Sequence, residues 1–160
     1  SIMNNINISA YHDFSDDVIG ALKFYGKSIN GVDGDVRLTR RLFLPRKRIR
    51  GFEARKVGPK DGIDWIGGNY ATALTAEAKL PNLLPETYRT DISVFMDSAN
   101  LWGVDYNEGL SDTNTIRSSI GVSANVFTTI GPLSFTLAAP ISQASTDVTE
   151  TFNFNLGTSF

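Results

Sequence analysis

The stretch that decides the fold is residues 69–80, which read NYATALTAEAKL. Its even positions include the large apolar side chains of Tyr70 and Leu74, whereas its odd positions are small or polar and end with Glu77 and Lys79. Successive side chains of a β-strand point to opposite faces of the sheet. The stretch therefore predicts a strand with one apolar face and one small, polar face.

The same period of two recurs along most of the chain, and helical periodicity is hard to find. The predicted strands cover residues 5–11, 18–29, 69–80, 88–97, 115–127, 132–140 and 150–160, and residues 36–44 are a possible extra short strand. Each predicted strand leads into the next without a helical crossover. We expect an all-β fold in which seven or eight strands form an antiparallel up-and-down meander.

The predicted connections alternate in length, with short turns at residues 12–17, 81–87 and 128–131. The longer loops lie at residues 30–67, 98–114 and 141–149. In a meander, alternate connections emerge at the same end, so the short turns share one rim and the longer loops share the other. This sorting of connections by length is typical of a transmembrane β-barrel of the outer membrane. The second strand face suits a hydrated lumen, because it carries the charged residues Glu77, Lys79, Arg89, Asp91, Asp97 and Arg117.

The composition argues against several kinds of catalytic and binding site. The chain has 160 residues, no cysteine and one histidine, and its formal net charge is -2. Without cysteine, thiol and zinc-thiolate chemistry are excluded. His12 falls in a predicted turn and has no nucleophile to activate. The net charge gives no argument for a nucleic-acid partner. The basic cluster within residues 37–60 is interpreted as a solvated loop. We expect no enzyme activity, no catalytic residue, no metal site and no cofactor.

A series of short motifs, in order along the chain, resembles the C-terminal half of the barrel of BamA-type outer-membrane insertases. The motifs are Ile49-Arg50-Gly51-Phe52, Gly67-Gly68-Asn69, Phe95-Met96-Asp97, Asn100-Leu101-Trp102-Gly103, the Ile116-to-Gly121 run, Gly131-Pro132-Leu133 and the terminal Phe152-to-Phe160 run. The resemblance implies the C-terminal part of a 16-stranded transmembrane β-barrel. It also implies that residues 1–160 are one domain of a longer protein, with an extracellular loop at about 30–67, and that the POTRA domains of the family are absent from this chain.

The resemblance gives a role to the loop motif Ile49, Arg50, Gly51 and Phe52. In the family, the arginine of this motif folds back into the lumen and docks on acidic residues of the wall, and the matching positions here are Glu77 and Asp97. Both have the inward parity of their predicted strands. Judged from the residues alone, the alternative is that both carboxylates are simply solvated in the lumen.

The last predicted strand carries the second candidate. Its residues Phe152, Phe154, Leu156, Gly157 and Phe160 resemble the C-terminal signal of outer-membrane β-proteins, which is recognised by strand addition. The plain alternative is that these side chains face lipid. The two interpretations are compatible, because one describes assembly and the other the folded barrel.

The resemblance thus implies a protein of the bacterial outer membrane that inserts and folds β-barrel clients. The implied partners are the lipid bilayer, unfolded outer-membrane protein clients and accessory assembly lipoproteins. Two alternatives stay open: a TamA-like or two-partner-secretion transporter barrel, and a passive porin-like channel. A lipase or protease barrel is disfavoured, because it needs a nucleophile, a histidine and an acid on facing strands.

Overall fold

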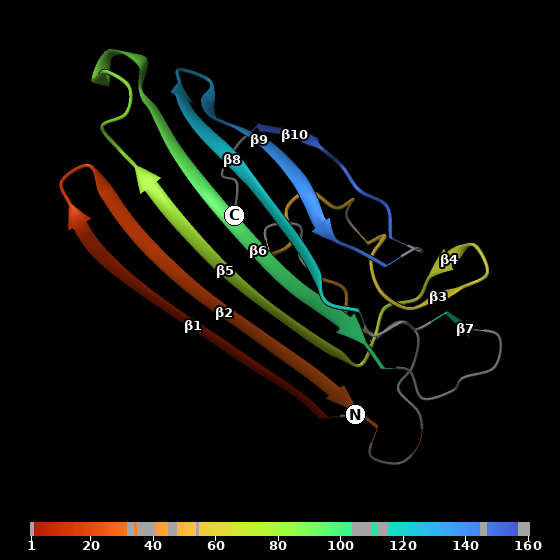
Figure 1. Ribbon diagram of the computed structural model, residues 1–160. Coiled ribbons are helices and arrows are strands. Elements are labelled where there is room, and N and C mark those ends of the chain that lie inside the picture. The colour runs from red at the N-terminus through yellow and green to blue at the C-terminus, as the bar shows by residue number, and fades with distance from the viewer. Residues whose placement is uncertain are drawn as a thin grey trace.

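A computed structural model describes residues 2–31, 34, 41–44, 48–53, 55–103, 110–111, 115–144 and 147–156. Its main feature is a seven-stranded antiparallel sheet (Figure 1), in which each strand pairs with its neighbours along the chain. The strands, in their order across the sheet, are β1 (Ile2–Ser15), β2 (Val18–Asn30), β5 (Tyr70–Leu80), β6 (Thr90–Trp102), β8 (Arg117–Thr128), β9 (Gly131–Ser142) and β10 (Phe152–Leu156). The all-β meander expected from the sequence is confirmed, and the sheet is open between β1 and β10.

Four strands, β1, β2, β6 and β9, are longer than the alternation predicted, and β9 takes the first two residues of the loop predicted at 141–149. The predicted turn at residues 12–17 is wrong for its first four residues, because β1 continues through Ser15, whose partner is Val18. The predicted loop at residues 98–114 is wrong at its start, because β6 continues to Trp102. Polar residues such as His12, Asp13, Ser98 and Asn100 are typical of a loop in a sequence, but a strand with one polar face accommodates them.

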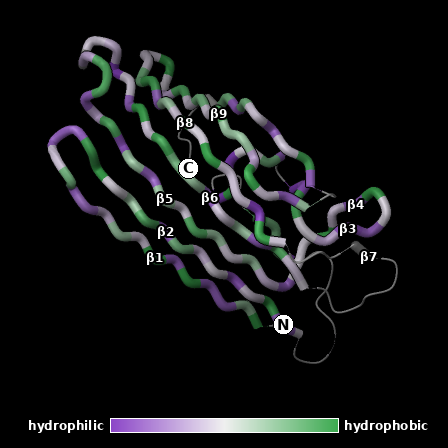
Figure 2. Tube along the Cα trace, viewed as in Figure 1, coloured by the Kyte–Doolittle hydropathy of each residue, from purple (hydrophilic) through white to green (hydrophobic). Residues whose placement is uncertain are grey.

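The two faces of the sheet differ as the alternation predicts, and hydrophobic and hydrophilic residues alternate along its strands (Figure 2). On β5 and β6, the odd positions Ala73, Phe95 and Ala99 are buried. The even positions Leu74 and Val94 are exposed, at 45% and 42%. One face of the sheet, the outer face, therefore carries exposed apolar side chains, and the opposite, inner face carries buried ones.

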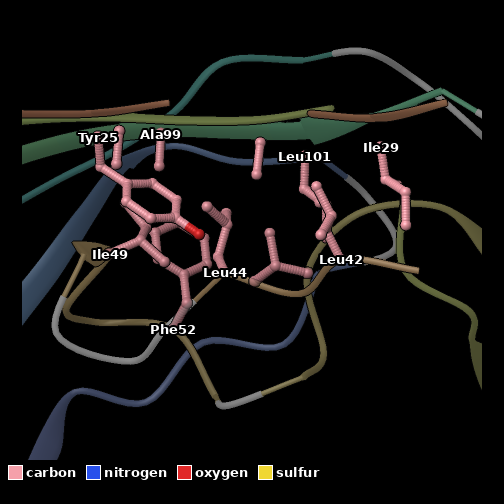
Figure 3. Packing of buried hydrophobic residues seen from close by; sticks show 11 residues of the cluster. Tyr25, Ile29, Leu42, Leu44, Ile49, Phe52, Ala99 and Leu101 are labelled. Atoms are coloured by element: carbon pink, nitrogen blue, oxygen red, sulfur yellow. The ribbon is translucent and has the colours of Figure 1, made fainter. Parts of the chain in front are cut away.

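The buried core lies between the inner face of the sheet and the long loop. The loop contributes Leu42, Leu44, Ile49, Phe52 and Val57, and the sheet contributes Tyr25, Ile29, Ala71, Ala73, Ala99 and Leu101. Figure 3 shows the loop side chains pointing toward the strands. Burial of apolar surface thus holds the loop on the sheet, and the small alanines of the wall leave room for it.

The two long connections also pair with each other. A small three-stranded sheet has the order β4–β3–β7 and contains β3 (Lys60–Asp61), β4 (Asp64–Trp65) and β7 (Leu110–Ser111). Within the predicted extra strand, residues 36–40 lie outside the described part of the chain, and Leu42 forms only an isolated bridge with Gly68. A 3₁₀ turn, η3 (Glu86–Tyr88), precedes β6. None of the described helical segments has the length and apolar character to cross a membrane.

Gly121 supplies a test of the sheet. A Cβ atom at this position would clash with the Leu137 carbonyl oxygen and would lie 2.7 Å from the Phe95 ring. We expect Gly121→Ala to destabilise the folded barrel by about 1–3 kcal/mol, because the backbone of β9 would have to shift. The measurement is the urea midpoint of the full-length protein refolded in lipid vesicles.

Gly26→Ala is the matched control, since its Cβ would meet only the Phe24 ring, at 3.3 Å, and this side chain is partly exposed and free to move. Equal midpoints for the two variants would contradict the close approach of β8 to β9.

Candidate functional site

The long loop contacts the inner face of the sheet at Arg50 and Gly51. Gly51 has a φ of 93°, a conformation that residues with a Cβ rarely adopt. A Cβ atom there would lie 3.0 Å from that of Ala138 and 3.3 Å from that of Ser119. Glycine thus allows the loop backbone to turn directly against the wall, which brings the arginine before it into the inner face.

The Arg50 side chain reaches two acidic residues of that face. Its Nε donates to Asp97 Oδ2 over 2.8 Å, and one terminal nitrogen donates to Asp97 Oδ1 over 3.0 Å. The same terminal nitrogen lies 3.3 Å from Glu77 Oε2. The structure therefore brings together the three residues that the sequence analysis singled out, with Asp97 as the main partner in a two-point hydrogen-bonded pair.

Strand register explains why both carboxylates lie within reach of one guanidinium. Thr75 pairs with Asp97 and Glu77 pairs with Phe95, so the two acids lie diagonally across β5 and β6 on the same face. The Phe95 ring lies below the guanidinium, with 3.6 Å between its centroid and Arg50 Cζ. The cation therefore rests on an aromatic face while its edge meets the carboxylates.

The burial of these charges makes the pairing strong. The Asp97 side chain is fully buried, and those of Arg50 and Glu77 are 15% and 10% exposed. Asp97 Oδ2 also accepts the backbone N–H of Arg50 over 3.0 Å. Burial alone would lower the pKa of the Arg50 guanidinium, but the hydrogen bond and charge of Asp97, together with Glu77, raise that pKa above its ordinary value. Arg50 is therefore cationic throughout the physiological range.

The residues flanking Arg50 complete the docking. Ile49 and Phe52 are each 2% exposed and belong to the core between loop and sheet. The Ser119 hydroxyl on β8 donates to the Arg50 carbonyl oxygen. The loop is thus held by apolar burial on both sides of the arginine and by polar contacts to β5, β6 and β8.

The neighbouring basic residues have other surroundings. Arg48 donates to Asn7 Oδ1 over 3.0 Å, and its Cζ lies 5.1 Å from the Tyr25 ring centroid. Arg55 is exposed and stacks on Phe43. Neither residue contacts a carboxylate of the wall in the interactions that the structure records, so the docking contact with Glu77 and Asp97 belongs to Arg50.

A polar cavity of about 320 Å³ adjoins the docked arginine. Its lining includes Arg50, Glu77, Lys23, Lys79 and Ser123. Apart from Arg50, which comes from the long loop, these side chains lie on the inner face of β2, β5 and β8, which gives the cavity the character of a hydrated interior. Glu77 thus has water-accessible space on one side and Arg50 on the other.

Sequence reasoning missed a second buried ion pair beside the first. Arg117 Nε donates to Asp147 Oδ2 over 2.8 Å, and the two side chains are 1% and 0% exposed. Arg117 was expected to face the lumen, but Asp147 lies in a polar loop that follows β9. Nothing in the local sequence distinguishes this aspartate from its neighbours, because the pairing depends on how the loop crosses the inner face.

The last strand is described only in part. Phe152 and Phe154 lie on β10 opposite Leu137 and Phe135, and are 53% and 49% exposed. Leu156 ends β10, and its side chain is not described. Gly157 and Phe160 lie outside the described residues. The two phenylalanines share the exposed apolar face of the sheet.

Within the described part of the chain, no group of three or more His, Asp or Glu side chains is arranged to hold a metal ion. His12 lies on the exposed strand β1, with its ring 4.8 Å from that of Phe14.

Comparison with known families matches residues 3–160 to the Omp85 superfamily domain. The chain belongs to the Omp85 superfamily. Two relatives are outer membrane protein assembly factors BamA. That of Neorickettsia risticii (strain Illinois) is 30% identical over 146 residues, which cover 89% of this chain and 19% of the relative. That of Neisseria meningitidis serogroup B is 27% identical over 139 residues, or 70% of this chain and 17% of the relative.

A solved structure has the same fold as this chain. The crystal structure of BamA from Haemophilus ducreyi lacking POTRA domains 1–3 matches 95% of this chain and 34% of that one, with a TM-score of 0.83 and 24% identity. The chain spans about a fifth of the length of the curated relatives it matches. As a member of this family, it is a bacterial outer-membrane protein with the fold of part of the BamA barrel.

The docking geometry predicts how the loop responds when its main carboxylate is lost. In the full-length protein, Asp97→Asn leaves the buried Arg50 without its hydrogen-bonded counter-charge, a change that typically costs about 3–5 kcal/mol. We expect the loop to leave the wall more often. Trypsin should then cleave after the basic residues of the loop at least about tenfold faster than in the unaltered protein.

Asp91→Asn is the matched control, because Asp91 is on the same strand with the same parity but is exposed. Cleavage of the Asp97→Asn variant at the rate of this control would contradict the anchoring contact.

Proposed function

We propose that this Omp85 chain is the C-terminal barrel portion of a BamA-type outer-membrane protein assembly factor, which inserts and folds β-barrel clients into the outer membrane. The observation that carries the proposal is the Arg50 loop, docked on Asp97 and Glu77 of the inner wall. Family membership and the two assembly-factor relatives support the same function.

In this proposal, residues 1–160 form one domain, the loop of about residues 30–67 begins on the extracellular side, and the POTRA domains lie elsewhere in the full protein. The loop acts as a plug inside the lumen, with Ile49, Gly51 and Phe52 supporting the Arg50 anchor. A docked plug keeps the wall of the barrel in one arrangement, and the outer surface of that wall contacts lipid.

The proposed mechanism is physical rather than enzymatic. The barrel perturbs the bilayer, and a strand edge offers unpaired N–H and C=O groups to an incoming client strand, which adds to the sheet by hydrogen bonding. The partners are the bilayer, unfolded outer-membrane protein clients and, in the full complex, accessory assembly lipoproteins. No cofactor is required for such a mechanism.

The last strand is assigned two roles in the same proposal. During assembly of the protein itself, the signal strand consists of Phe152, Phe154, Leu156, Gly157 and Phe160. In the folded barrel, the exposed aromatic rings of Phe152 and Phe154 belong to the lipid-facing surface.

The test of the assembly function uses the full-length protein in proteoliposomes supplied with an unfolded outer-membrane client. We expect Arg50→Ala to reduce the rate of client folding at least about tenfold, because the loop loses a buried charge-assisted contact. Arg50→Lys should restore only part of the rate, because an ammonium cannot form the two-point contact.

The control is Arg55→Ala, which removes an exposed cation from the same loop. Client folding that is unaffected by Arg50→Ala would contradict the role of the loop. Ion conductance by the unaltered protein without any client folding would instead favour a passive channel, and translocation of a secreted substrate would favour a transporter.

The membrane orientation of the sheet has its own test. Leu137, which is 55% exposed, lies on the outer face near the middle of β9, and neighbouring Thr136 points inward. We expect Leu137→Arg to destabilise the protein in vesicles by about 2–4 kcal/mol, because it moves a charge into hydrocarbon.

Thr136→Arg on the same strand is the control and should cost less, since its side chain enters the polar interior. The comparison is made by urea unfolding in vesicles. A larger loss for Thr136→Arg would show that the lipid-facing side is wrongly assigned.

A further inference from the structure

The connection between β9 and β10 lies directly against the long loop. The N–H of Glu53 donates to the Val148 carbonyl oxygen over 2.8 Å, and the N–H of Val148 donates to the Lys56 carbonyl oxygen over 3.1 Å. The N–H of Glu150 donates to the Gly51 carbonyl oxygen over 2.9 Å. The loop residues that follow Arg50 therefore pair, through their backbone, with the residues that precede β10.

This pairing continues into the last strand. The Thr151 carbonyl oxygen accepts the N–H of Ala138, and the next residue, Phe152, pairs with Leu137 as the first residue of β10. Among the described residues, the β10 register with β9 comprises five residue pairs, from Phe152 to Leu156. An edge strand is paired on one side, so contacts at the start of β10 contribute to its order.

The Arg117–Asp147 pair holds the first part of the connection between β9 and β10. Besides the contact from Nε, one terminal nitrogen of Arg117 donates to Asp147 Oδ1 over 3.2 Å, and the other donates to Asn100 Oδ1 over 2.7 Å. Asp147 Oδ2 also accepts the N–H of Ala144 over 2.9 Å. Arg117 therefore joins β8 and β6 to a carboxylate that shapes the connection itself.

Asp147 also contacts the long loop, because its Oδ1 accepts the N–H of Gly58 over 3.4 Å. The Asp147 carboxylate thus contacts the inner wall through Arg117, the β9–β10 connection through Ala144 and the long loop through Gly58. Since both side chains of the ion pair are buried, neither charge has water to replace a lost partner.

We propose that Arg117 and Asp147 are positioning residues that couple the docked Arg50 loop to the start of β10, so that the two segments dock and release together. Arg50 holds the loop from one side, through β5 and β6. The Arg117–Asp147 pair holds the β9–β10 connection from the other side, through β8. The backbone hydrogen bonds between residues 51–56 and 148–150 join the two. The coupling belongs to the folded barrel and holds whether or not the protein assembles clients.

Amide hydrogen exchange in the full-length protein in lipid vesicles tests the coupling without a client. The reporters are the amides of Glu53, Val148 and Glu150, because each donates across the contact. We expect Asp147→Asn to accelerate exchange at all three amides by about tenfold or more. Because coupling between two sites is reciprocal, Arg50→Lys should also accelerate exchange at Val148 and Glu150.

A purely local role predicts a different pattern. If Asp147→Asn accelerated exchange at Val148 and left Glu53 unchanged, or if Arg50→Lys left Val148 and Glu150 unchanged, the coupling would be overturned. Should Asp147→Asn fail to fold, Arg117→Lys keeps the charge but loses the fork that meets both Asp147 oxygens and Asn100. It should give the same pattern at smaller amplitude, and unaltered exchange at Glu53 would overturn the proposal.

The matched control is Lys56→Gln. It breaks the ion pair between Lys56 and Glu53, whose side chains are 42% and 39% exposed, within the same stretch of loop. A solvent-exposed pair contributes little, so exchange at the three reporter amides should stay within about twofold of the unaltered protein. Acceleration as large as that of Asp147→Asn would show that any change in this loop opens the contact, and would overturn the specific role of the buried pair.

Discussion

The ion pair between Arg50 and Asp97 is the interaction on which the rest of the interior depends. Apolar burial of Ile49 and Phe52 draws the long loop onto the sheet, but such burial has no direction and tolerates many placements. The guanidinium fork adds direction, because it must meet the two oxygens of one fully buried carboxylate. The register between β5 and β6, which brings Glu77 beside Asp97, thereby determines where the loop lies.

Because the outer face of the sheet is apolar and exposed, the buried core of the protein does not lie on that face. Here the core forms between the inner wall and a loop. The wall contributes three alanines together with Tyr25, Ile29 and Leu101, and the loop contributes leucine, isoleucine, phenylalanine and valine. Small wall residues let the loop approach closely, and buried charges on the same wall give it a unique position. The polar interior is thus both a hydrated surface and a docking surface, and the Arg117–Asp147 pair adds a second fixed point on it.

The alternation at residues 69–80 and 88–97 predicted the strands, their order and their two faces, because a period of two is a local property that neighbouring residues already display. The proximity of Arg50 to Glu77 and Asp97 was an expectation from resemblance, and no local pattern could have supplied it, since 47 residues separate Arg50 from Asp97. The Arg117–Asp147 pair and the β3–β7 pairing had no signal at all, because they depend on how two irregular loops cross. Strand ends were also misjudged where the polar residues His12, Asp13, Ser15, Ser98 and Asn100 continue a strand instead of ending it.

The central claim is that Arg50 and Asp97 act as one unit in holding the loop. A double-mutant cycle on the full-length protein in lipid vesicles measures this directly, from the urea-unfolding free energies of Arg50→Ala, Asp97→Ala and the double variant. We expect the double variant to be less destabilised than the sum of the two single variants, with a coupling free energy of about 1–3 kcal/mol. Additive losses would mean that the two side chains contribute independently, and that the loop is not held by them as one unit.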